Sequence, residues 1–388
     1  MNVDGICDPR FSPVRDAFRE NFASRGELGA AVAVSIDGRI VVDLWGGVAD
    51  KVSGRPWTRD TTVVVFSCTK GATALCAHVL AARGQLDLDA PAARYWPEFA
   101  AAGKETIPVR MLLNHQSGLA AIDQPLPAHA LYDWDTMATA VAAQAAQWEP
   151  GIAHGYHAVT FGWLVGEVVR RISGRSLGGF FRDAVAGPLG LDFWIGLPEA
   201  LEARVAPIRM APLTGETTPL MRALADRGSL ISKAFMNPPG LMTARQVNAR
   251  VLHAAEVPAA NGIATARALA GMYAPLACGG RSGSVELVDR DTLHAMAMVQ
   301  SEGNDRILLI PTRFASGFMK SIDNRPGDSA ILGPNPEAFG HAGAGGSIGM
   351  ADPVAHVALG YVMNQLGPGV LLNARGQALI DALYACLG

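Results

Sequence analysis

The chain opens with a pattern that is typical of an antiparallel β-hairpin. Residues 29–36 are apolar and lead into Asp37-Gly38, a dipeptide that favours a tight turn, and residues 40–45 follow as a partner strand. Two strands joined by so short a turn must be antiparallel, because a parallel pair needs a crossover of a dozen or more residues. This opening therefore argues against a doubly wound α/β fold.

The middle of the chain has helical periodicity, and its end returns to strands. Helices are predicted at residues 13–25, from Ser67 to a Gly84 cap, and at 133–147, 159–172, 176–186 and 370–386, with Thr243 and Thr265 as N-caps of two more. Strands are predicted at residues 314–319, 345–350 and 354–363, the last two joined by a turn at Asp352-Pro353.

Strands at both ends with helices between them predict an α+β fold, an antiparallel sheet flanked by helices. We expect residues 1–64 and 262–388 to form one discontinuous sheet domain and residues 65–261 to form a mostly helical inserted domain. Within that insertion, residues 191–242 are rich in Pro, Gly and Thr and are predicted to form a long irregular loop over the site.

Ser67 and Lys70 stand where an apolar, β-branched run meets the start of a helix. Residues three apart share one helix face, so a partly desolvated Lys70 amine could take the Ser67 proton. Free amides at the helix start would favour negative charge there. The alternative is a chance Ser-x-x-Lys in which Ser67 is only an N-cap. Gly71, inside the same helix, suggests that another element packs closely against it.

Two further side chains invite a catalytic interpretation. His115 lies near the end of a short helix, and we expect it to bond loop backbone rather than act as a base. Ser347 lies in a Gly-x-Ser-x-Gly pattern that resembles a nucleophile elbow, but that motif needs a helix after the serine. Here the sequence after Ser347 predicts a turn and a strand that contains His356, so we interpret the match as chance.

Three motifs together resemble the serine β-lactamase and penicillin-binding-protein superfamily. Ser67-Cys68-Thr69-Lys70 is similar to its first motif, Tyr156-His157-Ala158 stands where class C members have Tyr-x-Asn, and His341-Ala342-Gly343 stands where they have Lys-Thr-Gly. The segments HGYHAVTFGWLVGEVVRRISG and FGHAGAGGSIGMADP resemble above all the family VIII carboxylesterases, which are esterases on the class C β-lactamase fold. The alternatives are a Tyr156 that packs on Trp163 and a His341 that only bonds backbone.

The resemblance implies an acyl-enzyme on Ser67 and acid–base work shared by Lys70 and Tyr156. A nearby ammonium would favour ionised Tyr156, and the sequence does not settle which of the two takes the first proton. It also implies an oxyanion hole from the Ser67 and Ala344 N–H groups, with Gly343 and His341 contacting the substrate. No metal or organic cofactor is implied.

Two departures from the family pattern favour a small, neutral ester over an anionic β-lactam. Ala158 replaces an asparagine amide, and His341 replaces a lysine that binds carboxylate in β-lactamases. The expected function is hydrolysis of short-chain carboxylic esters. The alternatives are acyl transfer to an alcohol, weak β-lactamase activity and, least expected, a non-catalytic binding protein.

Composition narrows the partners. A net charge of -3 without a basic block argues against nucleic acid or an anionic membrane surface. The five cysteines are scattered and odd in number, so reduced thiols are expected, and the first residues lack the pattern of a signal peptide. We therefore expect a cytoplasmic enzyme whose partner is a small-molecule ester, with an oligomeric state that the sequence leaves open.

Overall fold

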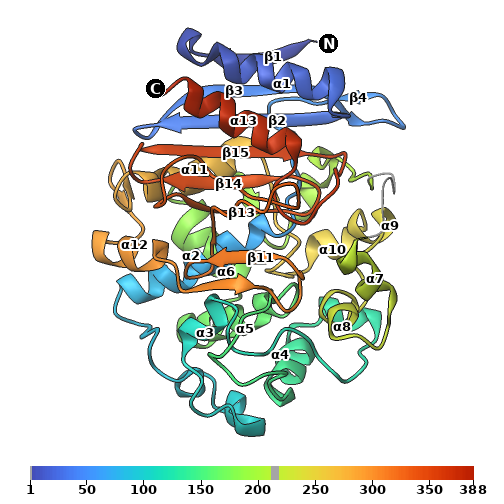
Figure 1. Ribbon diagram of the computed structural model, residues 1–388, viewed down its shortest axis with the longest axis vertical. Helices are drawn as coiled ribbons and strands as arrows, with labels where there is room; N and C mark the ends of the chain where they lie inside the picture. Colours follow the sequence, from blue (N-terminus) through green and yellow to red (C-terminus); the bar gives the residue numbers. More distant parts are fainter. Residues whose placement is uncertain (1, 211–217) are drawn as a thin grey trace.

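A computed structural model of the chain describes residues 2–210 and 218–388, and within these residues the backbone forms a ten-stranded antiparallel sheet (Figure 1). Nine of its strands follow one another in the order β1-β3-β2-β15-β14-β13-β12-β11-β10, and β4 pairs with β3. The strands of this sheet are β1 (Val3–Cys7), β2 (Gly29–Ile36), β3 (Arg39–Asp50), β4 (Arg55–Pro56), β10 (Ser301–Asn304), β11 (Pro311–Phe314), β12 (Met319–Lys320), β13 (Phe339–Ala342), β14 (Ile348–Asp352) and β15 (Val357–Met363). Two smaller sheets contain β5 (Val63–Val64), β6 (Phe193–Trp194) and β7 (Ile263–Ala264), and β8 (Arg281–Ser282) and β9 (Val285–Glu286).

The α-helices of the described residues lie on both sides of this sheet, and many of them lie in the lower half of Figure 1. They are α1 (Ser12–Ser24), α2 (Cys68–Ala82), α3 (Val109–Leu113), α4 (Trp134–Ala143), α5 (Phe161–Ser173), α6 (Leu177–Phe181), α7 (Pro219–Ala225), α8 (Leu230–Met236), α9 (Ala244–Val247), α10 (Arg250–Ala254), α11 (Ala266–Ala277), α12 (Arg290–Ala297) and α13 (Ala374–Ala385). No helix in residues 2–210 or 218–388 is both long and apolar enough to cross a membrane.

Helices cover both faces of the sheet, which confirms the predicted α+β fold. Gly349 and Gly360 are paired in β14 and β15, and a Cβ on either would run into α11. Tyr361, the next residue of β15, points to the opposite face and bonds Glu27 there. On that face α1 packs against α13 (Figure 1). The sheet is therefore a buried middle layer, as its apolar strands require.

Several sequence predictions agree with these elements. The β2–β3 hairpin is antiparallel and turns at Asp37 and Gly38, as expected. The Thr243 side chain forms a capping box at α9, and that of Thr265 accepts from the Ala268 N–H at the start of α11. A Cβ on Gly71 would collide with the Tyr273 hydroxyl, so α11 is the element that needs a glycine there.

Other predictions differ at the end of the chain, where apolar turns read as strands. Residues 314–319 are not one strand, because β11 ends at Phe314 and the chain turns back through Gly317, whose φ of +86° suits a tight turn. The strand predicted at 345–350 begins only at Ile348. The turn before β15 extends to His356, which therefore lies outside the strand predicted to contain it.

Some strands were not predicted, and one region was predicted with too little secondary structure. Several short strands were not predicted from the sequence, among them β1, β10 and β13. The irregular loop expected at 191–242 contains β6, α7 and α8, and its residues 211–217 lie outside the described part of the chain.

Candidate active site

Ser67 lies in the turn that joins the buried strand β5 to helix α2. The residue before it, Phe66, has a φ of +46°, an uncommon conformation for a non-glycine residue and one that clusters at functional sites. Ser67 occupies the N-cap position, yet its side chain makes no capping bond. Its half-buried hydroxyl is therefore free for other contacts, which argues against the interpretation of Ser67 as a simple cap.

Lys70 is fully buried one turn into α2, and its amine faces Ser67. The amine nitrogen Nζ lies 3.2 Å from Ser67 Oγ, 2.8 Å from the Ala158 carbonyl oxygen and 2.9 Å from the Ala259 carbonyl oxygen. Burial lowers the pKa of Lys70 well below its usual value, and no carboxylate of the described residues opposes this shift. The neutral amine that a base requires is therefore favoured.

The two carbonyl groups explain how Lys70 is held without the asparagine of the family motif. Ala158 has no amide side chain, but its backbone carbonyl accepts a hydrogen bond from Nζ. A neutral amine has two N–H donors and one lone pair. Because Ala158 and Ala259 supply two acceptors, the lone pair is left to face the Ser67 hydroxyl.

The structure places Tyr156 beside this pair. Its ring centroid lies 4.7 Å from Lys70 Nζ, and the ring stacks on Phe314 with a centroid distance of 6.0 Å. Burial raises the pKa of Tyr156, and the nearby Ser67 hydroxyl lowers it less. Within the described residues its hydroxyl has no partner at ordinary hydrogen-bond length. The ionised tyrosine that we expected beside an ammonium is thus disfavoured, because both groups are desolvated.

The third predicted segment packs against the start of α2. The Cys68 thiol donates to the His341 carbonyl oxygen at 3.1 Å, and a Cβ on Gly343 would collide with the Val65 carbonyl oxygen. Ala344 follows as the exposed residue of an otherwise buried turn. Within the described residues, neither Ser67 nor Ala344 donates its backbone N–H to a carbonyl. Two unpaired amides on adjoining segments are what an oxyanion hole needs.

His341 is a buried, neutral side chain at this site. Its Nδ1 lies 2.8 Å from the Ala342 carbonyl oxygen, so Nδ1 carries the hydrogen and Nε2 is an acceptor without a partner among the described residues. Burial, with help from Lys70, lowers the pKa of His341 to about 3. Its ring lies 6.1 Å from that of Tyr156. His341 therefore carries no positive charge at neutral pH.

The two competing side chains have structural surroundings. His115 accepts the backbone N–H of His157 at its Nδ1, 3.1 Å away, which confirms the interpretation that it bonds loop backbone. Ser347 is fully buried, and the chain continues from it into strand β14 rather than a helix. The strand–turn–helix context of a nucleophile elbow is therefore missing at Ser347.

Asp305 supports the site and was not predicted from the sequence. The two oxygens of this buried carboxylate lie 3.0 and 3.1 Å from the backbone nitrogen of Tyr156, and they also accept from Ile307, Leu308 and Thr312. Burial raises the pKa of Asp305, whereas these N–H donors lower it. Asp305 lies 149 residues from Tyr156, and no local pattern marks it.

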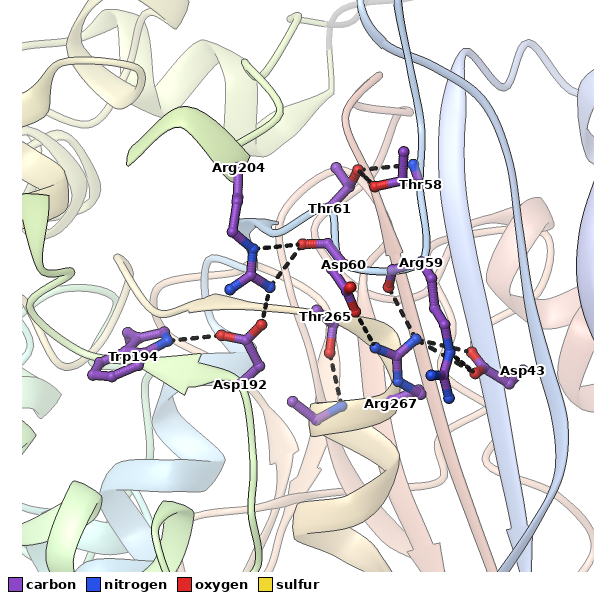
Figure 2. Close-up of polar contacts among 11 residues, drawn as sticks. Asp43, Thr58, Arg59, Asp60, Thr61, Asp192, Trp194, Arg204, Thr265 and Arg267 are labelled. Atoms are coloured by element: carbon purple, nitrogen blue, oxygen red, sulfur yellow. Dashed lines mark hydrogen bonds and ion pairs between the residues drawn. The ribbon is translucent and has the colours of Figure 1, made fainter. Parts of the chain in front are cut away.

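A charged network braces the loop that leads into β5 and Ser67 (Figure 2). Arg204 donates to the Asp60 carbonyl oxygen and pairs with Asp192, while Arg267 pairs with the Asp60 side chain at 2.8 Å and with Asp43. The hollow beside it, about 620 Å³ in volume, is lined by residues such as these and by none of the predicted site residues. We therefore assign this network a structural role.

Comparisons with known proteins show the family and the fold of this chain. The sequence matches the beta-lactamase family over residues 14–384. It is 40% identical to the esterase/beta-lactamase LipL of Mycobacterium tuberculosis over 96% of this chain and 86% of that protein. A family VIII carboxylesterase structure aligns with a TM-score of 0.91 at 40% identity, and a penicillin-binding-protein homologue from Caulobacter crescentus aligns with 0.88 at 38%; both alignments cover 100% of each chain. The chain therefore belongs to the β-lactamase family, and its fold is that of the family VIII carboxylesterases.

Proposed function

We propose that this protein is a serine carboxylesterase that hydrolyses small, neutral esters through an acyl-enzyme on Ser67. The observation that carries the proposal is a buried lysine without a carboxylate partner, with its amine 3.2 Å from the Ser67 hydroxyl. The names of its relatives support the reaction class, since LipL is called an esterase and the similar structure a carboxylesterase.

In the proposed acylation, Lys70 takes the proton of Ser67 as Oγ attacks the ester carbonyl. The developing oxyanion is held by the N–H groups of Ser67 and Ala344. The proton then passes from Lys70 to the departing alkoxide, which leaves as an alcohol. In deacylation Lys70 takes a proton from water, water attacks the acyl group, and the proton returns to Ser67. The proton count balances without a cofactor.

Tyr156 acts in this proposal as a hydrogen-bond donor. Because burial keeps its phenol protonated, it can donate to the departing oxygen, and its hydroxyl has no competing partner at ordinary length in the described structure. Lys70 is then the first base. This division of roles replaces the symmetrical relay that the sequence alone left open.

The preference for neutral esters follows from the missing charge. His341 stands where class C β-lactamases have a lysine, and its imidazole is neutral at physiological pH. The amide that those enzymes direct at a β-lactam is also absent, since Ala158 offers only its carbonyl, and Lys70 already occupies that group. A substrate carboxylate would therefore be desolvated without a positive partner.

Mass spectrometry of the acyl-enzyme tests the function directly. The protein is mixed with p-nitrophenyl butyrate, quenched in acid and digested, and the acyl group is expected on the peptide that contains Ser67. A parallel series compares p-nitrophenyl acetate with an ester that carries a free carboxylate, and we expect faster turnover of the neutral ester. No acyl adduct and no turnover would favour a non-catalytic binding protein.

Two related activities are separated in the same assay. Adding methanol or another alcohol and measuring the new ester reveals an acyltransferase, because the alcohol then competes with water for the acyl-enzyme. Turnover of nitrocefin reveals β-lactamase activity, which the name of the LipL relative makes worth measuring. We expect hydrolysis of the simple ester to exceed both.

The pH profile of kcat/KM is expected to reflect Lys70. The neutral amine is the active form, so activity should fall as the pH drops through the Lys70 pKa, which burial places well below 10.5. Full activity is expected on the alkaline side of that pKa. The profile should be measured within the range where circular dichroism shows a folded protein. If the kcat/KM of Lys70→Met falls with decreasing pH as steeply as that of the wild type, this assignment is contradicted.

A further inference from the structure

The turn after β13 is fixed in a way that the catalytic proposal does not use. Gly343 bonds Ser347 across the turn with N···O 2.7 Å, and Gly346 donates its N–H to the Gly343 carbonyl oxygen at 3.0 Å. The peptide between residues 343 and 344 is trans, so its N–H points away from its C=O. Since that C=O is turned into the turn, the Ala344 N–H must face outward, away from Gly346.

The next link is the peptide that joins Gly345 and Gly346. Its N–H is the donor just described, and its carbonyl oxygen on Gly345 accepts three hydrogen bonds. These come from Asn373 Nδ2 at 2.8 Å, Arg375 Nη2 at 3.1 Å and the Gly367 N–H at 2.9 Å. A carbonyl has two lone pairs, so three donors hold it more tightly than a turn on the surface requires.

The two side chains are themselves fixed. Asn373 is the N-cap of α13, where its Oδ1 accepts the backbone N–H of Arg375 at 3.1 Å. The Arg375 guanidinium is buried and also bonds the Glu27 carboxylate at 2.9 Å and the Gln365 carbonyl oxygen at 2.8 Å. Each side chain therefore has one end anchored in the fold and the other on Gly345.

Glycines make room for this clamp. A Cβ on Gly346 would collide with the Asn373 amide, and one on Gly367 would come within 2.6 Å of the Arg375 guanidinium. Gly345 has a φ of +83° and would meet Leu366. Glycine at these positions is thus needed so that the backbone can contact the Asn373 and Arg375 side chains. A turn that only connects two strands would not need such contacts.

We propose that Asn373 and Arg375 are positioning residues that orient the Ala344 N–H for the oxyanion, acting through the two planar peptides of the 343–346 turn. The proposal rests on the proposed function, since it assumes that Ala344 donates to an oxyanion on the Ser67 adduct. Neither side chain touches the substrate in this scheme. Asn373 and Arg375 fix the Gly345 carbonyl and therefore the orientation of the Gly345–Gly346 peptide. The N–H of that peptide bonds the Gly343 carbonyl, which fixes the orientation of the peptide between residues 343 and 344.

The test compares Asn373→Ser and Arg375→Lys with the wild-type protein. Serine keeps a cap acceptor for α13 but removes the donor to Gly345, and lysine keeps a charge beside Glu27 but cannot reach all three partners. Gln377→Ala is the matched control, because Gln377 lies on the same helix and bonds Ile331 instead. For each, kcat, KM and melting temperature are measured, with the inhibition constant of phenylboronic acid, whose tetrahedral adduct on Ser67 presents an oxygen to the hole.

For Asn373→Ser and Arg375→Lys we expect kcat to fall about tenfold to a hundredfold with little change in KM, less than the loss caused by deleting an oxyanion donor. The boronic acid inhibition constant should rise by a similar factor, and Gln377→Ala should match the wild type. Unchanged kcat, a change in KM alone, or a lower kcat with unchanged boronic acid binding would overturn the proposal. If Arg375→Lys does not fold, Asn373→Ser decides. A wild-type protein that forms no acyl-Ser67 would instead refute the function itself.

Discussion

Ser67→Ala should abolish ester hydrolysis, whereas Ser347→Ala should retain most of it. Loss of a serine nucleophile lowers kcat by roughly 10⁶-fold in a well-studied serine hydrolase, so activity is expected to fall to background. The reason is local: the Ser67 side chain is partly exposed, and its hydroxyl lies 3.2 Å from the amine of buried Lys70, whose pKa is lowered. Ser347 is fully buried at the start of β14, where an ester cannot reach it.

The pair of variants controls for folding as well as for chemistry. Ser347 Oγ has no hydrogen-bond partner among the described residues, so its removal leaves no partner unsatisfied and should change stability little. Initial rates with p-nitrophenyl butyrate and mass analysis of the adduct give the readout. Normal turnover by Ser67→Ala together with an inactive, folded Ser347→Ala would exchange the two assignments and remove the basis of the proposed mechanism.

The second large effect is expected on stability in mild acid. Desolvation lowers the pKa of five buried histidines: that of His78 to about 4, those of His157 and His341 to about 3, that of His115 well below its usual value, and that of His154 beside Asp305. In the unfolded chain they would take up protons near pH 6.5. The stability that these histidines contribute is therefore fully present above that pH and is lost as the pH falls toward the folded-state values.

The magnitude is large because the effects add. At pH 5 each unfolded-state histidine contributes roughly 2 kcal/mol in favour of unfolding. Glu27 acts in the opposite direction, because burial raises its pKa to about 7 and the folded state binds its proton more readily, and Asp305 does the same. Because the buried histidines outnumber these two carboxyl groups, a net loss of stability is expected as the pH falls toward 5.

Urea unfolding at pH 7.5, 6.5 and 5.5 measures this loss. His78→Gln is the informative variant, because an amide can replace the ring at the Ser316 carbonyl oxygen, 2.8 Å away, without titrating. Its slope of unfolding free energy against pH should be smaller than that of the wild type by one proton, about 1.4 kcal/mol per pH unit. Equal stability at all three pH values in the wild type would show that these histidines are not held neutral.

The side-chain part of the site could be predicted from the sequence because each motif is local. The spacing of Ser67 and Lys70 places both side chains on one face at the start of a helix. Tyr156 and His341 lie in short motifs, and the order of these motifs along the chain suggests a common site. The contacts that could not be predicted involve backbone groups or residues that are far apart in the sequence. The carbonyl of Ala259 has no side-chain signature, and Asp305 is recognisable only once the chain has brought it to Tyr156.

The errors in the fold have a similar cause. Turns at Gly317 and Gly345 lie in buried, apolar surroundings, so they carry the composition of strands. These turns have apolar rather than polar residues because each packs against another part of the fold and is buried there. The β2–β3 hairpin was predicted correctly because its turn is on the surface and uses the residues that such turns favour.

The pairing of β2 with β15 has a consequence for biosynthesis. These neighbours in the sheet lie roughly 320 residues apart in the chain, from Ile36 to Val357. At about 5–20 residues per second, the ribosome needs some 15–60 s to deliver β15 after β2 has emerged. During that interval one edge of an apolar strand is without its partner, and Ser67 waits without the segment that contains Ala344. We therefore expect nascent chains that have not yet exposed β15 to lack a complete site and to be prone to aggregate.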